Sequence, residues 1–277
     1  MAAIIARVPL IEWQKGFERH WNGGNPVVTH AFNALSFILP MFERLFIDVD
    51  LEVVKGLDFS LHSEIKSGVK GFISQESIHS NQHHQYNAVL QQQGFDNVVH
   101  SYIVSLHEYL QRHFSPLTKL AVVCGYEHYT AILGNYILSN PQVLKPAQPD
   151  MALVWGWHSA EEMEHKAVCF DLYQAAGGGW IRRVFVFLPV TLNFTFIFSR
   201  LYLSLLYRDG CLKPSRLFKT IAWLVKLFFG GDGVGWHIIG YGLCYLSPRF
   251  HPWRQDNRDK LHAWLTANHV HLRIVGE

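Results

Sequence analysis

The chain has 277 residues, of which 49% are hydrophobic and 17% are charged, and its net charge is +2 with histidine neutral. A charged fraction this low predicts that much of the chain is buried or faces lipid. The charges are nearly balanced and no dense Lys/Arg run with interleaved aromatic residues occurs, so no nucleic-acid partner is expected.

Residues 1–25 are expected to form an irregular lead-in, without the basic segment and long apolar core of a signal peptide. Beyond it, apolar residues recur with the 3.6-residue period of helices, which predicts an all-α fold. Pro40 should kink the first helix one turn before Glu43. Capping residues, first-turn prolines and terminal glycines define the boundaries. The expected helices span residues 26–47, 60–93, 96–113, 115–139 and 150–177.

The composition becomes more apolar after the triple glycine at residues 177–179. These segments predict either a second helical layer over the bundle or a hairpin that faces or enters a membrane. Pro189 and Asn193 interrupt the longest apolar run, which falls short of the roughly 20 residues that span a bilayer, so buried or peripheral helices are favoured. The apolar segments are residues 184–198, 217–229 and 234–246, and a surface helix is expected from about 253 to 277.

Three parts are therefore expected: the lead-in (1–25), a metal-binding helical bundle (26–177) and a C-terminal helical extension (178–277). The extension would pack on the bundle or face a membrane. The four cysteines, Cys124, Cys169, Cys211 and Cys244, are widely spaced without a CxxC pair, which indicates a reducing compartment. The expected location is the cytoplasm, either free, peripheral at the inner membrane or embedded in it.

Two of the expected helices carry the same trio of one glutamate and two histidines. Residues three, four or seven positions apart lie on one face of a helix, so each trio projects a carboxylate and two imidazoles in one direction. The trios are Glu76, His79 and His83 in one helix and His158, Glu162 and His165 in the other.

Two further helices each place a lone glutamate inside apolar sequence. Glu43 lies between Phe42 and Leu45, and Glu127 follows Tyr126. A buried carboxylate without a partner is costly, so metal ligation explains these positions better than any partner in the sequence. The resulting order along the chain, Glu, ExxH, Glu, ExxH, is the ligand set of a ferritin-like dinuclear carboxylate site in a four-helix bundle.

Some residues near the trios leave alternatives open. His158 is favoured as a ligand, whereas His83 fits either a ligand or a hydrogen-bond partner of one. Glu161 competes with Glu162 for the metal by register, and His84 and His128 point away from the ligand faces. The expected metal ligands are Glu43, Glu76, His79, His83, Glu127, His158, Glu162 and His165.

The donor atoms are carboxylate oxygens and imidazole nitrogens without thiolate. This mixture suits two iron ions, with manganese as the second choice and zinc less suited. Two adjacent divalent ions can either bind and reduce O₂ or activate hydroxide for hydrolysis. The ligand types are the same in both cases, so they separate the two reactions poorly.

The ligand order resembles the ferritin-like di-iron superfamily, and His-x-x-x-Glu-x-x-His from His158 is similar to the p-aminobenzoate N-oxygenases. His83 departs from that pattern and would occupy a metal position that O₂ or substrate otherwise uses. Residues 10–260 also resemble a bacterial family of predicted metal-dependent hydrolases, through Phe17–Trp21, Gln75–His79 with His83, and Trp157–His165. The first resemblance implies Glu43, Glu76, His79, Glu127, His158, Glu162 and His165 as ligands.

These features together favour an O₂-dependent non-haem di-iron oxidoreductase that acts on an amine or a hydrophobic small molecule. Its partners would be O₂ and an external electron donor, with a membrane surface and a second copy of the chain as further expectations. The alternatives are a dinuclear metal-dependent hydrolase and a non-enzymatic iron-binding or membrane-associated helical protein. Neither a GxSxG motif nor a Rossmann or P-loop glycine pattern indicates another chemistry.

Overall fold

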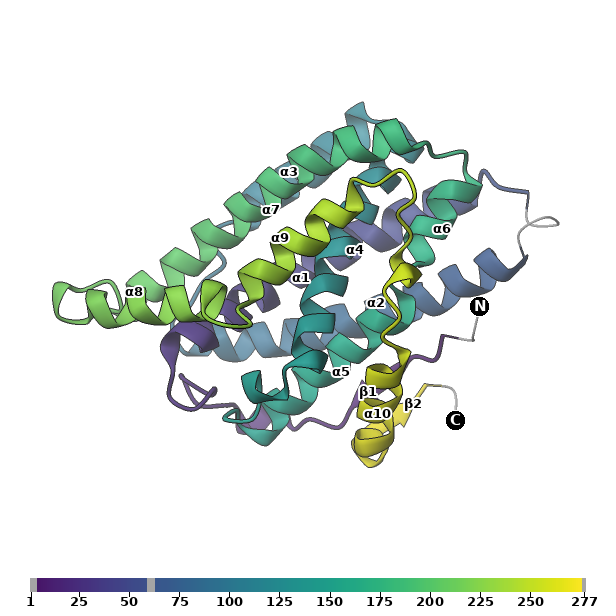
Figure 1. Ribbon diagram of the computed structural model, residues 1–277. Coiled ribbons are helices and arrows are strands. Elements are labelled where there is room, and N and C mark those ends of the chain that lie inside the picture. Colours follow the sequence, from purple (N-terminus) through teal and green to yellow (C-terminus); the bar gives the residue numbers. More distant parts are fainter. Residues whose placement is uncertain (1–3, 59–62, 276–277) are drawn as a thin grey trace.

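The computed structural model describes residues 4–58 and 63–275 and confirms the all-α fold (Figure 1). Within the described residues, one antiparallel sheet of two short strands, β1 (Arg7–Pro9) and β2 (Leu272–Ile274), joins the two ends of the chain. The lead-in is therefore not wholly irregular, because β1 anchors it. The expected helix starting near residue 60 and the end of the chain at 277 reach outside the described residues.

Four helices carry the expected metal ligands. Asn25 caps the first of them by accepting hydrogen bonds from the backbone N–H groups of Val27 and Val28. Ser115 accepts a hydrogen bond from the Thr118 N–H at the start of the third, as expected. The four are α1 (Pro26–Val54), α2 (Ser63–Gln92), α4 (Pro116–Ser139) and α5 (Pro149–His165), and α3 (His100–His113) connects α2 to α4.

The expected single helix over 150–177 is wrong, because the chain turns directly after His165. The first part is α5 and the second is α6 (Val168–Ala175). In the turn, the Lys166 ammonium donates hydrogen bonds to the Gln255 carbonyl and the Asn257 side chain. These partners lie about ninety residues away in the chain, so the apolar periodicity of residues 150–177 does not predict that the helix breaks after His165. The first helix also runs past its expected end at residue 47, and Pro40 lies inside it.

The C-terminal part forms a second layer of helices over the bundle. Figure 1 shows α7 (Trp180–Arg208) and α9 (Val234–Tyr245) lying along it, with α8 (Pro214–Phe229) extending beyond its edge. Pro189 and Asn193 do not end α7, which is long and apolar enough, by length and composition alone, to cross a membrane. The expected surface helix after residue 253 is shorter than expected, because only α10 (Arg258–Asn268) is α-helical there and β2 follows it.

The hydrophobic core lies between α1, α2, α4 and α5 and continues onto the inner face of α7. Phe46, Leu90, Trp157 and Leu205 are fully buried in it. The ligand-bearing residues lie inside this core and not at its edge. The division of the chain into three parts stays a prediction.

Candidate metal centre

Four glutamates and three histidines from the four helices converge in the core of the bundle. All are buried, and the most exposed of them is His158 at 5%. Three groups among them place their donor atoms within 4.8 Å of one another, and these groups share members. The residues are Glu43 from α1, Glu76 and His79 from α2, Glu127 from α4, and His158, Glu162 and His165 from α5.

One end of the centre is built around His165. Its Nε2 lies 3.2 Å from Glu76 Oε1 and 3.4 Å from Glu162 Oε2. The same nitrogen lies 3.6 Å from Glu127 Oε2. One imidazole nitrogen and three carboxylates thus surround a first candidate position for a cation.

The other end is built around His79 and His158. His79 Nδ1 lies 3.5 Å from Glu76 Oε1, and His158 Nε2 lies 3.2 Å from Glu162 Oε1. Glu43 joins this end, because its carboxylate groups with Glu76 and His79 within 4.8 Å. Glu76 and Glu162 therefore reach both ends, and these two carboxylates are suited to bridge a pair of cations.

Gln75 determines which nitrogen of His165 faces the centre. The Gln75 amide N–H₂ donates to the Ile5 carbonyl and to Glu164 Oε2, so its carbonyl oxygen faces His165 Nδ1 at 2.9 Å. His165 Nδ1 is then the protonated donor, and Nε2 points its lone pair at the three carboxylates.

Glu161 determines which nitrogen of His79 faces the centre. One oxygen of Glu161 accepts hydrogen bonds from the Arg7 backbone N–H and guanidinium at 3.0 and 3.3 Å. The other oxygen lies 3.1 Å from His79 Nε2 and accepts its hydrogen. His79 Nδ1 is left with a lone pair directed at Glu76 and Glu162. Glu161 is thus placed behind a ligand, and the alternative in which it replaces Glu162 at the metal does not fit its position.

A longer chain of hydrogen bonds orients His158. Asn87 donates to the Ser36 carbonyl, so its side-chain oxygen accepts the Ser36 hydroxyl hydrogen at 2.9 Å. The Ser36 oxygen then accepts from His83 Nδ1 at 2.9 Å, which leaves His83 Nε2 to accept from His158 Nδ1 at 3.3 Å. His158 Nε2 therefore carries a lone pair, and it faces a Glu162 oxygen.

The centre thus directs three imidazole lone pairs at carboxylate oxygens, which is unfavourable unless a cation lies between them. Both carboxylate oxygens of Glu43, Glu76 and Glu127 are buried without a hydrogen-bond partner, as is His79 Nδ1. Buried polar atoms without partners are rare and costly in folded proteins. The four carboxylates also carry four negative charges, which two divalent cations neutralise. The residues present therefore fit a dinuclear metal centre.

The pKa shifts in the centre follow from its burial and its crowded carboxylates. Burial alone would lower the pKa of His79 and of His165, but Glu161 and Glu76 beside His79 and Glu162 beside His165 outweigh it and raise both values. Burial raises the pKa of Glu43 well above its usual value, and the Glu76 carboxylate adds to the effect. Burial likewise raises the pKa of Glu127, with Glu162 adding to it. Burial lowers the pKa of His158, so this imidazole is neutral, as a metal ligand must be.

The sequence-predicted residues fall into two classes by position. Seven of the eight expected ligands surround the centre. His83 adjoins it, because a donor atom of His83 groups with Glu43 and His158 within 4.8 Å, and its ring nitrogens also contact Ser36 and His158. Arg44 pairs with Asp48 at 3.0 Å and not with the neighbouring Glu43. His84 is exposed, and His128 Nε2 binds the Tyr241 carbonyl at 2.9 Å, so both lie away from the centre as expected. The ligand roles themselves stay predictions.

Sequence reasoning missed the residues that orient the ligands. Arg7 lies 154 positions before Glu161, and Ser36 lies 47 positions before His83. No helical spacing links such residues, because they meet only when α1, α2, α5 and β1 pack together. Gln75 and Glu76 both lie in the Gln75–His79 motif that resembles the hydrolase family, but nothing in that motif indicates that Gln75 orients His165.

A second cluster joins His20, His30 and Asp209, at the contact between the lead-in, α1 and the end of α7. Trp21 and Tyr86 both donate to the Asn33 side-chain oxygen, so the Asn33 N–H₂ faces His30 Nδ1 at 3.2 Å. His30 Nε2 must then carry the hydrogen, which points at Asp209 from 3.2 Å. A nitrogen in this state does not bind a metal, so the cluster is a hydrogen-bonded junction.

A family model described as "Predicted metal-dependent hydrolase" matches residues 5–256. No curated protein and no solved structure matches the chain. The family description contradicts the expectation of an O₂-dependent di-iron oxidoreductase and agrees with the hydrolase that was its alternative. The oxidative interpretation is therefore wrong. It rested on the ligand types, which both reactions share and which do not decide between them. A relationship to the ferritin-like superfamily stays a prediction.

Proposed function

We propose that this chain, which belongs to the family of predicted metal-dependent hydrolases, hydrolyses an ester or amide bond at a pair of divalent cations. The observation that carries the proposal is the convergence of three imidazole nitrogens on buried carboxylates, of which Glu43, Glu76 and Glu127 have no hydrogen-bond partner on either oxygen. Such a site is costly to fold unless cations occupy it.

The donor set favours manganese or iron in the divalent state over zinc, because its oxygens and nitrogens include no thiolate. When bound, such ions supply Lewis-acid chemistry, in which a scissile carbonyl is polarised and the pKa of water is lowered. Glu127 and His165 would hold one ion, and Glu43, His79 and His158 the other. Glu76 and Glu162 lie near both positions and would help to hold both ions.

The surrounding residues keep this centre rigid and dry. Trp157 contacts the His79 ring edge-on with 4.8 Å between ring centroids, and Phe72 contacts His165 at 4.9 Å. Gln75, Glu161 and His83 hold the outer nitrogens of the three imidazoles. A low-dielectric shell strengthens every electrostatic interaction within it, and fixed ligands need no rearrangement during the reaction.

The net reaction consumes one water molecule. The water hydroxyl forms a bond to the acyl carbon, the bond from that carbon to the alcohol oxygen or amine nitrogen breaks, and the leaving group takes the remaining water proton. No external oxidant or reductant is involved, so the reaction proceeds without O₂.

The test is to strip the protein of metal, reload it with Mn²⁺, Fe²⁺ or Zn²⁺ without O₂, and measure bound metal and the hydrolysis of chromogenic esters and amides. We expect two equivalents of metal and turnover that depends on it. Glu127→Gln should retain about one equivalent and lose most of the turnover. Glu108→Gln, at an exposed position on α3, is the matched control and should behave like the native chain. No metal-dependent turnover with either bond type contradicts the proposal.

A further inference from the structure

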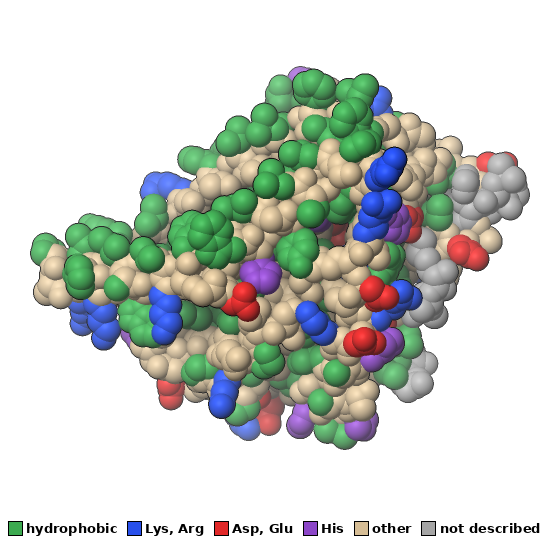
Figure 2. All heavy atoms as spheres, in the orientation of Figure 1, with side chains coloured by type: hydrophobic (Ala, Val, Ile, Leu, Met, Phe, Trp, Pro, Cys, Tyr) green, Lys and Arg blue, Asp and Glu red, His purple; other side chains and the backbone are tan. Residues whose placement is uncertain are grey.

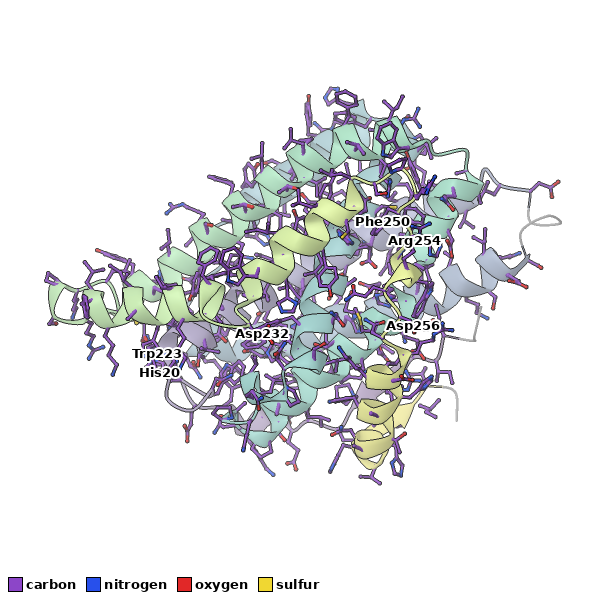
Figure 3. The ribbon with its side chains drawn as sticks, viewed as in Figure 1. His20, Trp223, Asp232, Phe250, Arg254 and Asp256 are labelled. Atoms are coloured by element: carbon purple, nitrogen blue, oxygen red, sulfur yellow. The ribbon has the colours of Figure 1, made fainter. Side chains whose placement is uncertain are left out.

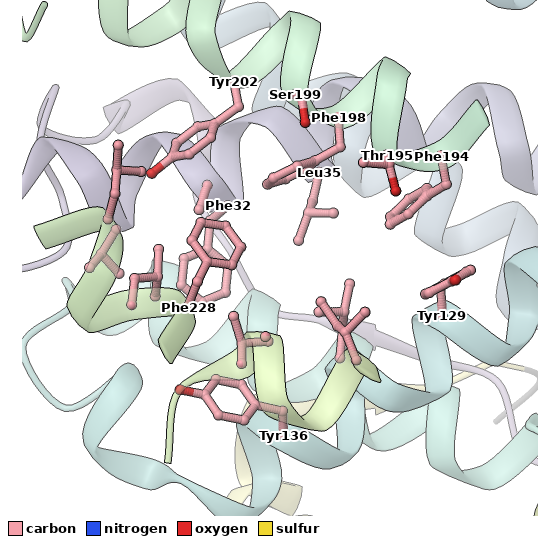
Figure 4. Close-up of a pocket in the computed structure, with 18 of the residues that line it drawn as sticks. Phe32, Leu35, Tyr129, Tyr136, Phe194, Thr195, Phe198, Ser199, Tyr202 and Phe228 are labelled. Carbon is pink, nitrogen blue, oxygen red and sulfur yellow. The ribbon is translucent and has the colours of Figure 1, made fainter. Parts of the chain in front are cut away.

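An apolar cavity of about 420 Å³ lies between α1, α4, α7, α8 and α9 (Figure 4). Its walls are almost entirely hydrophobic, with Phe32, Leu35, Phe194, Phe198 and Phe228 among them. A cavity of roughly 150 Å³ holds benzene, so this one has room for on the order of fifteen carbon atoms. That capacity corresponds to one long alkyl chain.

A second, smaller cavity of about 30 Å³ lies beside the first. Leu35, Leu133, Ile137 and Phe194 line both cavities, so the two adjoin. The inner cavity is also lined by His158, whose Nε2 faces Glu162 in the centre. The two adjoining cavities, here called the alkyl path, therefore extend to the side chain of a predicted ligand.

The path excludes charged groups. Within the described part of the chain, no Lys, Arg, Asp or Glu side chain lines either cavity. The two hydroxyl groups that line the inner cavity already donate hydrogen bonds to the backbone. Ser159 donates to the Trp155 carbonyl, and Thr130 donates to the Glu127 carbonyl. A ligand that fills this path is a hydrocarbon chain, with any charged group left outside the mouth.

The mouth opens on an apolar face of the molecule. Leu203 of α7, Phe229 of α8 and Ile239 of α9 line the outer cavity and are each about half exposed. Figure 2 shows hydrophobic side chains gathered over these helices. A chain that leaves the cavity therefore meets an apolar surface and not open water.

The face extends along the whole of α7. Its exposed hydrophobic residues are spaced by three, four or seven positions, so they form one stripe roughly 40 Å long. An exposed stripe of this size marks an interaction site in a folded protein. The stripe consists of Ile181, Phe185, Leu188, Leu192, Phe196, Leu203 and Tyr207.

The side chains of the α8 helix indicate which kind of partner suits this face. At about 100° per residue, Phe218, Ile221, Val225 and Phe229 share one exposed sector. Arg216, Lys219 and Lys226 share another, and no acidic residue occurs from 210 to 231. The Lys226 ammonium lies 5.0 Å from the ring centroid of Trp223, which is labelled in Figure 3. A helix with an exposed apolar face and a purely basic polar face is suited to the surface of an anionic bilayer.

We propose that a lipid bilayer covers the face formed by α7, α8 and α9, and that the metal centre hydrolyses the carboxylic ester of a lipid with one long alkyl chain. This inference rests on the proposed hydrolase function. An uncharged lipid ester would leave the bilayer with its ester end leading. The ester would then lie at the inner cavity that His158 lines, and the alkyl chain would fill the outer cavity back to the mouth. Hydrolysis adds the water hydroxyl to the acyl carbon, breaks the bond to the alcohol oxygen and gives the alcohol the remaining proton.

Docking is tested by sedimenting the full-length protein with phosphatidylcholine vesicles, with and without phosphatidylglycerol. The native chain should sediment with both and more strongly with the anionic vesicles. Phe185→Ser and Phe218→Ser, at the most exposed phenylalanines of α7 and α8, should each lower partitioning about 10-fold. Val270→Ser, an exposed apolar position after α10, is the control and should change little. Absence of sedimentation, or equal loss in the control, overturns bilayer docking.

The alkyl path is tested by binding of a fluorescent polyene fatty acid to the metal-free and the metal-loaded protein. Ser199→Trp, which fills the outer cavity, should weaken binding at least 10-fold in both states. Ser204→Trp lies on the same helix outside the cavity and should bind normally. Thermal melting of both variants checks that they fold. Normal binding by Ser199→Trp overturns the path.

Chain-length dependence separates this inference from the function on which it rests. Chromogenic esters from acetate to palmitate should be hydrolysed faster as the chain lengthens, and Ser199→Trp should abolish only that increase. Turnover that is equal for all chain lengths overturns the inference while the hydrolase function stands. Fatty-acid binding blocked by Ser199→Trp, without turnover of any ester, supports the alkyl path and overturns the proposed lipid hydrolysis. The hydrolase function fails as well only if amides are not hydrolysed either.

Discussion

His83 Nε2 lies 3.3 Å from His158 Nδ1, and this contact determines which face of His158 is free for a metal. His83 is itself oriented by Ser36, whose hydroxyl oxygen lies 2.9 Å from His83 Nδ1. The position of His83 suits a hydrogen-bond partner of a ligand, and its role as a ligand or a partner stays a prediction. As a partner, His83 keeps the neutral His158 ring in the tautomer that a cation requires.

Replacing His83 with Phe should weaken metal binding at the His79 and His158 end by about 10- to 100-fold, because His158 loses its acceptor. The His165 end should bind nearly as before, so a metal titration should separate into a tight and a weak equivalent. His83→Gln, whose carbonyl can accept the same hydrogen, should restore part of the affinity. His84→Phe is the matched control at the neighbouring exposed position. Equal weakening of both equivalents contradicts this role.

Glu161→Leu should also weaken metal binding about 10-fold or more, because His79 Nε2 loses its acceptor and Arg7 loses one of its acceptors. Glu161→Gln keeps an oxygen that can accept from His79 and should have a smaller effect. Isothermal titration of the metal-free variants measures both. Identical metal affinities of Glu161→Leu and Glu161→Gln would show that the hydrogen bond to His79 does not affect metal binding.

Removing the metal should lower the thermal stability of the fold. An ion held at a free concentration ~1,000-fold above its Kd stabilises the native state by about 4 kcal/mol. The Tm should therefore fall by roughly 10 °C or more on adding a chelator, measured by circular dichroism. The shift should be smaller in Glu127→Gln, where one position no longer binds. If the chelator leaves the Tm of the native chain unchanged, the result contradicts a dinuclear centre that is occupied by metal.

Asp209 should contribute acid-sensitive stability at the junction of the lead-in and α7. Burial alone would raise the pKa of Asp209, but its contacts with His30, Arg19 and His20 lower it below the usual range. A carboxyl group with a lowered folded pKa stabilises the fold above its unfolded pKa of about 3.9, and this stability is lost as the pH falls below that value.

Asp209→Asn should therefore destabilise the protein by about 2 kcal/mol at pH 7, because the amide N–H₂ faces groups that also donate. The difference from the native chain should narrow as the pH falls below about 4. Urea unfolding at several pH values measures both effects. Asp232→Asn, at a largely exposed position, is the control. A difference that stays constant down to acid pH would contradict the assignment.

Local signals in the sequence determined much of the bundle. Ser115 and Pro116 define the start of α4, and its end at Ser139 also agrees with expectation. The 3.6-residue spacing within each trio brings Glu76 next to His79 and His158 next to Glu162. These features depend on residues a few positions apart, and the helix geometry fixes their relative directions wherever the helix lies.

Only the tertiary structure decided which residues contact the predicted ligands and where the apolar cavities lie. The contact of Arg7 with Glu161, the turn after His165 and the two adjoining cavities arise from segments that are distant in the chain. Helical periodicity shows that a side chain faces inward, but not which side chain it meets there. That depends on how whole helices pack, and packing is a property of all their side chains together.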